Sequence, residues 1–583
     1  MKFRSFVYAL ASVVLVLLLI GAGGAYWLAA NNPLMLPQNS GLSSPKATVF
    51  VSKQSPVVMS LLVNPDRLAA YGLAAAPLDQ RRALQTRLNR FQHTLLANSQ
   101  LDYRQDVQPW LGDELTLAVT TTDIDRDTTN GQQLGYLLAA TAKNLDHARE
   151  SIQRYWQRCA ASGQDLVFEQ YAGVQIVYAG VNSLRDQERG KGGEGENVQS
   201  PHFTLATAIV GNGFVLFANS PKVLREAINN LQVPELSLSQ SEAYDQALQR
   251  LSEPHIGALY VHLPQLAAWM KAPKESPDML AVDSLPTYDS VVMGLKLDPQ
   301  GLLGNALLLT TPGVSIAPTP PILSAPVQAL QSIPASSPLV IAGRDLRQLW
   351  EQLDTELTGY ESLKQVIRKP LLVLCDQWGV EPEALLGWIQ GEYALGMLPR
   401  AGDRPNWILV TEVGEATPSG LERLNALAQS QGTTIGSFTI ADQPISVWTK
   451  LSATSMTRTR SGMAQRESLT IQAEVQGVHA TIGNYEILAS SLDAMDQAIH
   501  ASQNSIMASE SFQQAIAPLP ISNDGYVYLD GQGAQTLIEQ LTEGRSMVDA
   551  ARPFLEAIQS LTLSSRGSEA NAWQASVFIR LKD

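Results

Sequence analysis

Short stretches of alternating apolar and polar residues run along most of the chain and are separated by tight-turn signals. Residues 166–171 and 175–178 predict one hairpin, and residues 203–210 and 214–217 predict another across Gly211-Asn212-Gly213. Hairpins imply antiparallel pairing, and the amphipathic stretches between them predict helices that cover a face of the sheet. The pattern therefore predicts an α+β fold.

The chain also matches itself at a nearly constant offset. Residues 110–117 (WLGDELTL) recur at 388–395 (WIQGEYAL), and residues 241–248 (SEAYDQAL) recur at 509–516 (SESFQQAI). Further matching blocks keep the same order along the chain, which chance similarity would not do. We therefore predict two tandem copies of one module, each with an antiparallel sheet covered by helices.

The repeat sets the predicted domain boundaries. The first copy spans 46–312, a proline-rich connector spans 313–321, and the second copy spans 322–583. Before them lie an N-terminal segment, 1–31, and a linker, 32–45, which is rich in Asn, Pro, Ser and Gly.

The N-terminal segment has the composition of a membrane anchor. Residues 5–30 carry no charge and follow two basic residues, Lys2 and Arg4. A membrane-spanning helix needs about 20 apolar residues, whereas a cleaved signal has about 7–15. The length and the aromatic pair Tyr26-Trp27 predict one uncleaved transmembrane helix, and cleavage after Gly23-Gly24-Ala25 is the alternative. The N-terminus would then be cytoplasmic, the bulk of this single-pass protein exported.

Composition excludes two classes of protein. A net charge of −14 and a pI near 5.1 argue against nucleic acid as a partner, because phosphates require a basic surface. An apolar fraction of 45% excludes disorder of the whole chain. The two cysteines, Cys159 and Cys375, leave open either one disulfide or two buried thiols.

Two polar inserts interrupt the copies at corresponding positions. Residues 185–200 mix both charges, and residues 450–468 are basic; neither has hydrophobic periodicity, so both predict loops. A basic loop on an acidic chain suits an acidic partner or lipid headgroups, and a merely solvated loop is the alternative. The candidate interaction residues are Arg185, Arg189, Lys191, Lys450, Arg458, Arg460 and Arg466.

No motif for catalysis, metal or cofactor binding is present. The seven histidines form no His-Glu-x-x-His pattern, Cys-x-x-Cys is absent, and residues 190–195 lack the order of a phosphate-binding loop. We therefore predict no catalytic residue, no metal and no cofactor.

Two repeated Trp-x-x-x-Glu turns have a structural interpretation instead. Trp110 and Glu114 recur as Trp388 and Glu392. We expect each indole to be buried at a corner of the fold, with the carboxylate accepting backbone N–H groups.

On the N-terminal segment, the repeated Trp turns and the paired strands, the chain resembles a cyanobacterial domain-of-unknown-function family, number 3352. The resemblance covers nearly all of the chain after the N-terminal segment and implies no catalytic residues. It implies a setting at a thylakoid or plasma membrane, facing the thylakoid lumen or the periplasm.

These features predict a non-enzymatic, membrane-anchored binding or scaffold protein. Its partner would be a protein in or at the membrane, and its role that of an accessory or assembly factor of a membrane, photosynthetic, complex. One alternative is an envelope hydrolase or transferase with an unrecognised site. The other is a carrier of an apolar ligand such as lipid or pigment.

Overall fold

The structure of the chain is a computed structural model. It describes residues 44–66, 103–127, 133–180, 205–211, 213–251, 255–270, 286–298, 300–356, 360, 364, 368, 371–372, 374–376, 378–400, 405–457, 467–531 and 558–581.

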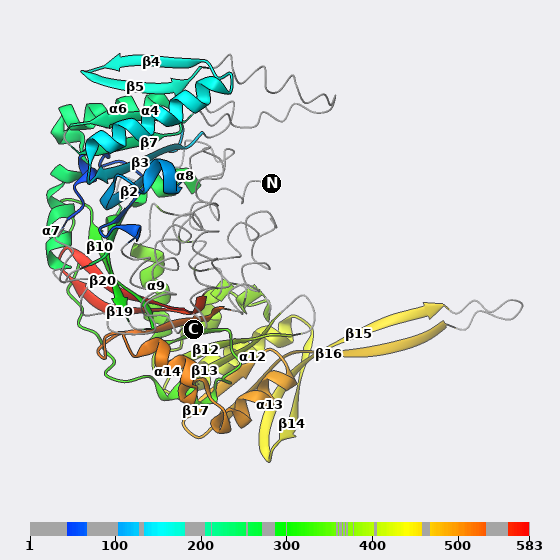
Figure 1. Cartoon of the computed structure of the whole chain (residues 1–583). Coiled ribbons are helices and arrows are strands. Elements are labelled where there is room, and N and C mark those ends of the chain that lie inside the picture. The colour runs from blue at the N-terminus through cyan, green and yellow to red at the C-terminus, as the bar shows by residue number, and fades with distance from the viewer. Residues whose placement is uncertain are drawn as a thin grey trace, which may run out of the picture.

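One antiparallel sheet of 20 strands forms the framework, and it curves into an open arc (Figure 1). The first ten strands are β1 (Val57–Leu61), β2 (Leu111–Thr121), β3 (Gly135–Ala142), β4 (Leu166–Tyr171), β5 (Val174–Ala179), β6 (Ala206–Val210), β7 (Phe214–Ala218), β8 (Gly257–His262), β9 (Tyr288–Asp298) and β10 (Gly301–Thr310). The others are β11 (Leu339–Arg344), β12 (Glu392–Leu398), β13 (Asn406–Glu412), β14 (Thr433–Ile440), β15 (Gln443–Thr457), β16 (Glu467–Ile482), β17 (Tyr485–Ala489), β18 (Gly525–Asp530), β19 (Ile558–Glu569) and β20 (Ala572–Leu581).

The strand pairings define a single path from one edge of the sheet to the other. The order is β4-β5-β6-β7-β3-β2-β1-β8-β9-β10-β20-β19-β18-β11-β12-β13-β17-β16-β15-β14. The pairings among β1–β10 recur among β11–β20: β1 lies between β2 and β8, as β11 lies between β12 and β18. The predicted boundaries at 46–312 and 322–583 stay a prediction.

The prediction of two tandem α+β modules, each with its own sheet, is wrong. β10 pairs with β20 from Gly301 opposite Arg580 to Leu309 opposite Ala572, so the sheet continues through the middle of the molecule. Each half ends in a hairpin whose last strand leaves one edge free. Pairing these two edges satisfies their backbone groups, which is why the halves do not remain separate.

Helices cover both faces of the sheet, so its central strands are apolar throughout. β1 is buried at every position because alternate residues meet different layers: Val58 packs with one core, and Val57 and Met59 pack with the other. One face carries α6 (Pro221–Gln232), α7 (Glu242–Arg250), α13 (Leu492–His500) and α14 (Glu510–Ile516). The other carries α4 (Leu145–Ala161), α8 (Leu263–Met270), α9 (Leu346–Glu356), α11 (Pro382–Leu386) and α12 (Thr417–Ser430).

Capping residues explain where several of these helices begin. The Ser241 side chain accepts the Tyr244 N–H at the start of α7, and Ser509 accepts the Phe512 N–H at the start of α14. Serine suits this position because its hydroxyl binds an N–H that has no partner inside the helix.

The prediction of a single-pass protein attached through an N-terminal helix is corrected here. Across the described residues, no helix combines the length and apolar character that crossing a membrane requires. The segment expected to do so, residues 5–30, lies outside them. Attachment through this helix, and with it the placement in a thylakoid lumen or periplasm, therefore has no support.

The β10–β20 junction can be tested at Gly301. A Cβ there would overlap the Ile579 carbonyl oxygen, so we expect Gly301→Ala to lower the free energy of unfolding by about 1–3 kcal/mol. Gly436→Ala is the matched control, because a Cβ at Gly436 in β14 meets nothing within 4 Å. Scanning calorimetry of both variants makes the comparison; equal unfolding temperatures for the two would contradict the close contact.

Candidate functional site

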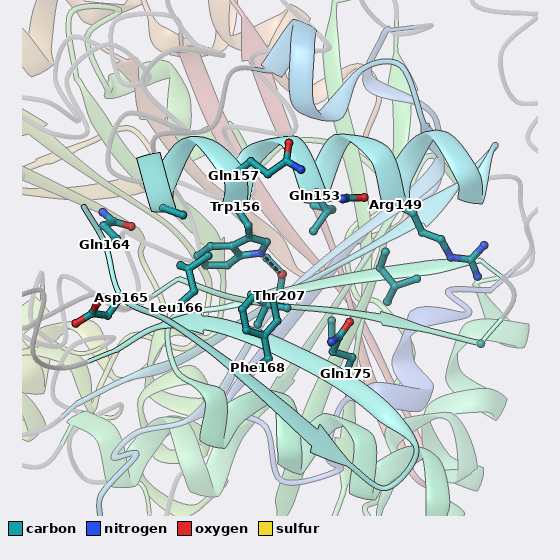
Figure 2. A pocket seen from close by; sticks show the side chains of 16 residues that line it. Arg149, Gln153, Trp156, Gln157, Gln164, Asp165, Leu166, Phe168, Gln175 and Thr207 are labelled. Carbon is teal, nitrogen blue, oxygen red and sulfur yellow. Dashed lines mark hydrogen bonds between the residues drawn. The ribbon is translucent and has the colours of Figure 1, made fainter. Parts of the chain in front are cut away.

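A groove lies between helix α4 and the outer strands β4, β5 and β6. Its volume is about 880 Å³, within the range of about 300–1,000 Å³ usual for small-ligand sites. Figure 2 shows α4 above and the strands below, with side chains from both walls directed into the space. The lining residues are Arg149, Ile152, Gln153, Trp156, Gln157, Ala160, Gln164, Asp165, Leu166, Phe168, Gln175, Val177, Thr207, Ala208, Ile209 and Gly211.

One stripe of α4 forms the upper wall of the groove. Arg149, Gln153, Gln157 and Ala160 follow a spacing of three to four residues, so they share a face of the helix. They are exposed, whereas Ile152 on the neighbouring stripe is buried. The helix is thus seated on the sheet along one side and open along the other.

Trp156 on α4 closes the groove on its inner side. Its indole Nε1 donates to the Thr207 hydroxyl on β6 at 2.8 Å, and the side chain is buried (Figure 2). Phe168 on β4 stands across the space from this indole and is 64% exposed, an unusual exposure for a large apolar side chain. The groove therefore presents a solvent-accessible aromatic floor.

The corresponding place in the second half is filled. A pocket of about 40 Å³ lies there between the end of α12 and the strands β14–β16, and Trp378 and Trp448 line part of it. These two indoles pack edge to face, with ring centroids 6.4 Å apart. Trp448 Nε1 donates to Asn425 on α12 at 2.8 Å, so in this half the strand side chain reaches the helix.

Strand register shows how this difference arises. In the β4–β5 hairpin, Leu166 pairs with Ala179. In the corresponding β14–β15 hairpin, the pair at the same number of residues from the turn is Ile435 with Trp448. Trp448 thus stands where the first half has Ala179. The first half instead places its tryptophan, Trp156, on the helix.

The lining offers hydrogen bonds and few charges. Four of its residues are glutamines, and its two charged side chains, Arg149 and Asp165, lie at opposite ends (Figure 2). From Arg149 to Ala160 the helix advances about 16 Å, which sets the length of the groove. No histidine, cysteine or serine is among the residues described as lining the groove. No group of three or more His, Cys, Asp or Glu side chains suited to a metal occurs in the described ranges.

The first predicted corner lies next to the first strand. Trp110 is fully buried, and its Nε1 donates to the Asp106 carbonyl at 2.5 Å. The Glu114 carboxylate accepts the backbone N–H groups of Ala47 at 2.7 Å and Lys46 at 3.0 Å. These N–H groups begin the short helix Ala47–Phe50, which precedes β1.

The second predicted corner has the same arrangement, but its glutamate is more exposed to solvent than Glu114. Glu392 accepts the N–H of Gln328, the first residue of the short helix Gln328–Ser332, at 2.8 Å and the Tyr485 hydroxyl at 3.1 Å. Trp388 is buried against Gly420 of α12, where a Cβ would overlap the indole. Both glutamates therefore hold a short helix against the sheet.

The predicted interaction loops lie mostly beyond the described part of the chain. Arg185, Arg189, Lys191, Arg458, Arg460 and Arg466 all fall outside it. Lys450 belongs to β15, opposite Thr433, so it lies on a strand and not in a loop. The predicted loop at 450–468 is shorter, because β15 continues to Thr457 and β16 begins at Glu467.

The structure also contains a buried pair of ionisable side chains that the sequence motifs did not predict. His479 Nδ1 lies 2.7 Å from Glu486 Oε1, and the Thr481 hydroxyl donates to the other carboxylate oxygen at 2.6 Å. The pair forms across the tight β16–β17 turn at Gly483-Asn484. The Gly483-Asn484 turn is the sequence signal that could have predicted this hairpin and so brought the two side chains together. Cys159 and Cys375 are both free and buried.

The chain belongs to a known protein family. The family described as "Protein of unknown function (DUF3352)" matches residues 10–581. The resemblance is thereby confirmed for the family, whereas a cyanobacterial source and membrane anchoring do not follow from the match. No curated protein and no solved structure matches the chain.

Truncating the glutamate at each corner should lower the free energy of unfolding by different amounts. Glu114→Ala leaves two backbone N–H groups without their acceptor next to a fully buried site, so we expect a loss of about 2–4 kcal/mol. Glu392→Ala affects a half-exposed carboxylate, and we expect a loss of about 0.5–1.5 kcal/mol. Urea denaturation measures both; a larger loss for Glu392→Ala would reverse the assignment.

Glu114 also predicts a pH dependence. Burial raises the pKa of this carboxyl group, and the N–H groups of Ala47 and Lys46 oppose the increase. The folded chain therefore keeps this proton to a higher pH than the unfolded chain, so the contribution of Glu114 to stability falls as pH rises above about 4.5. We expect the Tm of wild type, relative to non-titrating Glu114→Gln, to decrease from about pH 4 to pH 7. A constant difference in Tm would contradict the raised pKa.

Proposed function

We propose that this protein is a non-enzymatic binding protein, in an accessory or assembly role, whose ligand site is the groove between α4 and β4–β6. The observation that carries the proposal is the contrast between the halves. Between helix and outer strands, the first half has a groove of about 880 Å³, whereas the pocket at the corresponding elements of the second half has about 40 Å³. Since the second half shows how this fold fills the space, the open groove is not required by packing.

The lining favours binding over catalysis. A hydrolase or transferase site needs a nucleophile or an acid–base pair within hydrogen-bond reach. Arg149 and Asp165 lie at opposite ends, and the Thr207 hydroxyl is engaged by Trp156. Amides and aromatic rings, by contrast, are groups that fix the orientation of a bound molecule.

The groove also argues against a carrier of lipid or pigment. Such a ligand favours an enclosed, mostly apolar cavity, because every unpaired polar group that it buries costs free energy. Here four glutamine amides and two charged groups line the walls. A ligand with its own hydrogen-bonding groups fits better, which supports a protein partner.

Filling the groove tests the proposal. Ala160 is an exposed lining residue, so we expect Ala160→Trp to occupy the space without disturbing the core. Binding of the dye anilinonaphthalene sulfonate, followed by fluorescence, should weaken at least about tenfold, a loss of about 1.4 kcal/mol.

The matched control is Gln429→Trp on α12, an exposed position that precedes Ile435 by the same number of residues as Ala160 precedes its register equivalent, Leu166. It should leave dye binding unchanged. Equal dye binding by wild type and Ala160→Trp would contradict the proposed site.

A further inference from the structure

The outermost strand beside the groove has one free edge among the described residues. β4 pairs with β5 only, and Figure 1 shows it at the end of the arc. An edge strand exposes a row of backbone N–H and C=O groups to which another strand can bind.

The register identifies the outward-pointing groups. The Gly180 N–H donates to the Asp165 carbonyl at 2.7 Å, so this pair belongs to the hydrogen-bonded set. The β4–β5 turn has two residues, Ala172 and Gly173, both with positive φ, which keeps the same alternation to its end. The backbone groups of Leu166, Phe168 and Gln170 therefore point away from β5.

The same residues face the groove. Leu166 and Phe168 contribute side chains to its floor. In an antiparallel pair, residues opposite each other carry their side chains on the same face of the sheet. A strand bonded to Leu166 and Phe168 would thus direct every second side chain to the groove side.

We propose that the ligand of this groove is an extended polypeptide segment that binds as an antiparallel strand on β4. This inference rests on the proposed function and names its ligand class. Main-chain hydrogen bonds to β4 give affinity, and the alternate side chains enter the groove. Glutamine amides on the walls can pair with further peptide groups, because each offers both donors and an acceptor.

The sheet itself shows this mode of association. All its pairings are antiparallel, and β10 joins β20 by the same edge-to-edge contact. An antiparallel partner would begin near Gln170 and end near Leu166.

The charged ends of the groove give the ligand a polarity. Arg149, which also pairs with Asp146 at 2.9 Å, lies toward the same end as Gln175, just past the β4–β5 turn, and Asp165 lies just before Leu166 (Figure 2). The segment should therefore carry an acidic residue near its N-terminal end and a basic residue near its C-terminal end. β-branched and aromatic residues should separate them.

A displayed library of eight-residue peptides, selected on the full-length protein, supplies the probe. The most enriched peptide is then synthesised and titrated against variants. Gln170 is exposed, and its N–H points away from β5, so Gln170→Pro removes one edge donor without breaking the β4–β5 ladder. Gln170→Ala keeps that donor. We expect Gln170→Pro to weaken binding about tenfold relative to Gln170→Ala.

Residue-resolved hydrogen exchange gives an independent readout. On peptide binding, the amides of Leu166, Phe168 and Gln170 should become protected, while those of the intervening β4 residues are protected already. β14 is the internal control, because it has the same hairpin geometry beside a filled pocket. Its amides should not change.

The outcomes separate the two proposals. Groove-dependent dye binding without any enriched peptide overturns the polypeptide ligand and leaves the proposed function standing. A second pattern has the same meaning: Ala160→Trp weakens peptide binding, but Gln170→Pro and Gln170→Ala bind the peptide equally well and the β4 amides stay unprotected. In that case the peptide binds in the groove but not as a strand on β4. A peptide and a dye that both bind Ala160→Trp as they bind wild type overturn the proposed function itself.

Discussion

The pairing of β10 with β20 is the contact on which the rest of the architecture depends. Within the described residues, it joins two sets of ten strands into one sheet whose outermost strands are β4 and β14. Because the same pairing pattern occurs on each side, both ends offer equivalent places for a helix to cover the last strands. The first half leaves that place open, and the second closes it with indoles.

Whether the groove is open depends on whether a tryptophan side chain is carried by the helix or by the strand below it. A tryptophan on α4 extends downward to β6 and leaves the floor over β4 and β5 uncovered. A tryptophan on β15 rises from the floor and occupies it. Trp156 and Trp448 each donate their indole N–H group, to Thr207 and Asn425, whereas the buried Nε1 of Trp378 has no hydrogen-bond partner among the described residues. The filled site therefore leaves one buried donor unpaired, a cost that the packing of two indoles offsets.

Local structure was predictable from the chain, and long-range pairing was not. The expected hairpin at 166–171 and 175–178 is β4–β5, because alternation and a short turn are local signals. The edge pairing of Leu309 with Ala572 joins residues far apart in sequence and has no such signal, so the sheet was wrongly divided. The groove was missed for a related reason. Gln153, Gln157 and Gln175 form no motif, and only the position of α4 over the sheet brings them together.

At the centre of the sheet, Ala306 lies opposite Ala575, and these residues begin blocks that match in sequence. Each copy therefore meets its own counterpart, the arrangement of an isologous dimer interface within a single chain. In a dimer of identical subunits every mutation appears twice, and a groove opened in one subunit opens in both. Covalent fusion removes that constraint. One half can keep a packed end while the other keeps an open groove, so the strand pairing stays symmetric although the two ends differ.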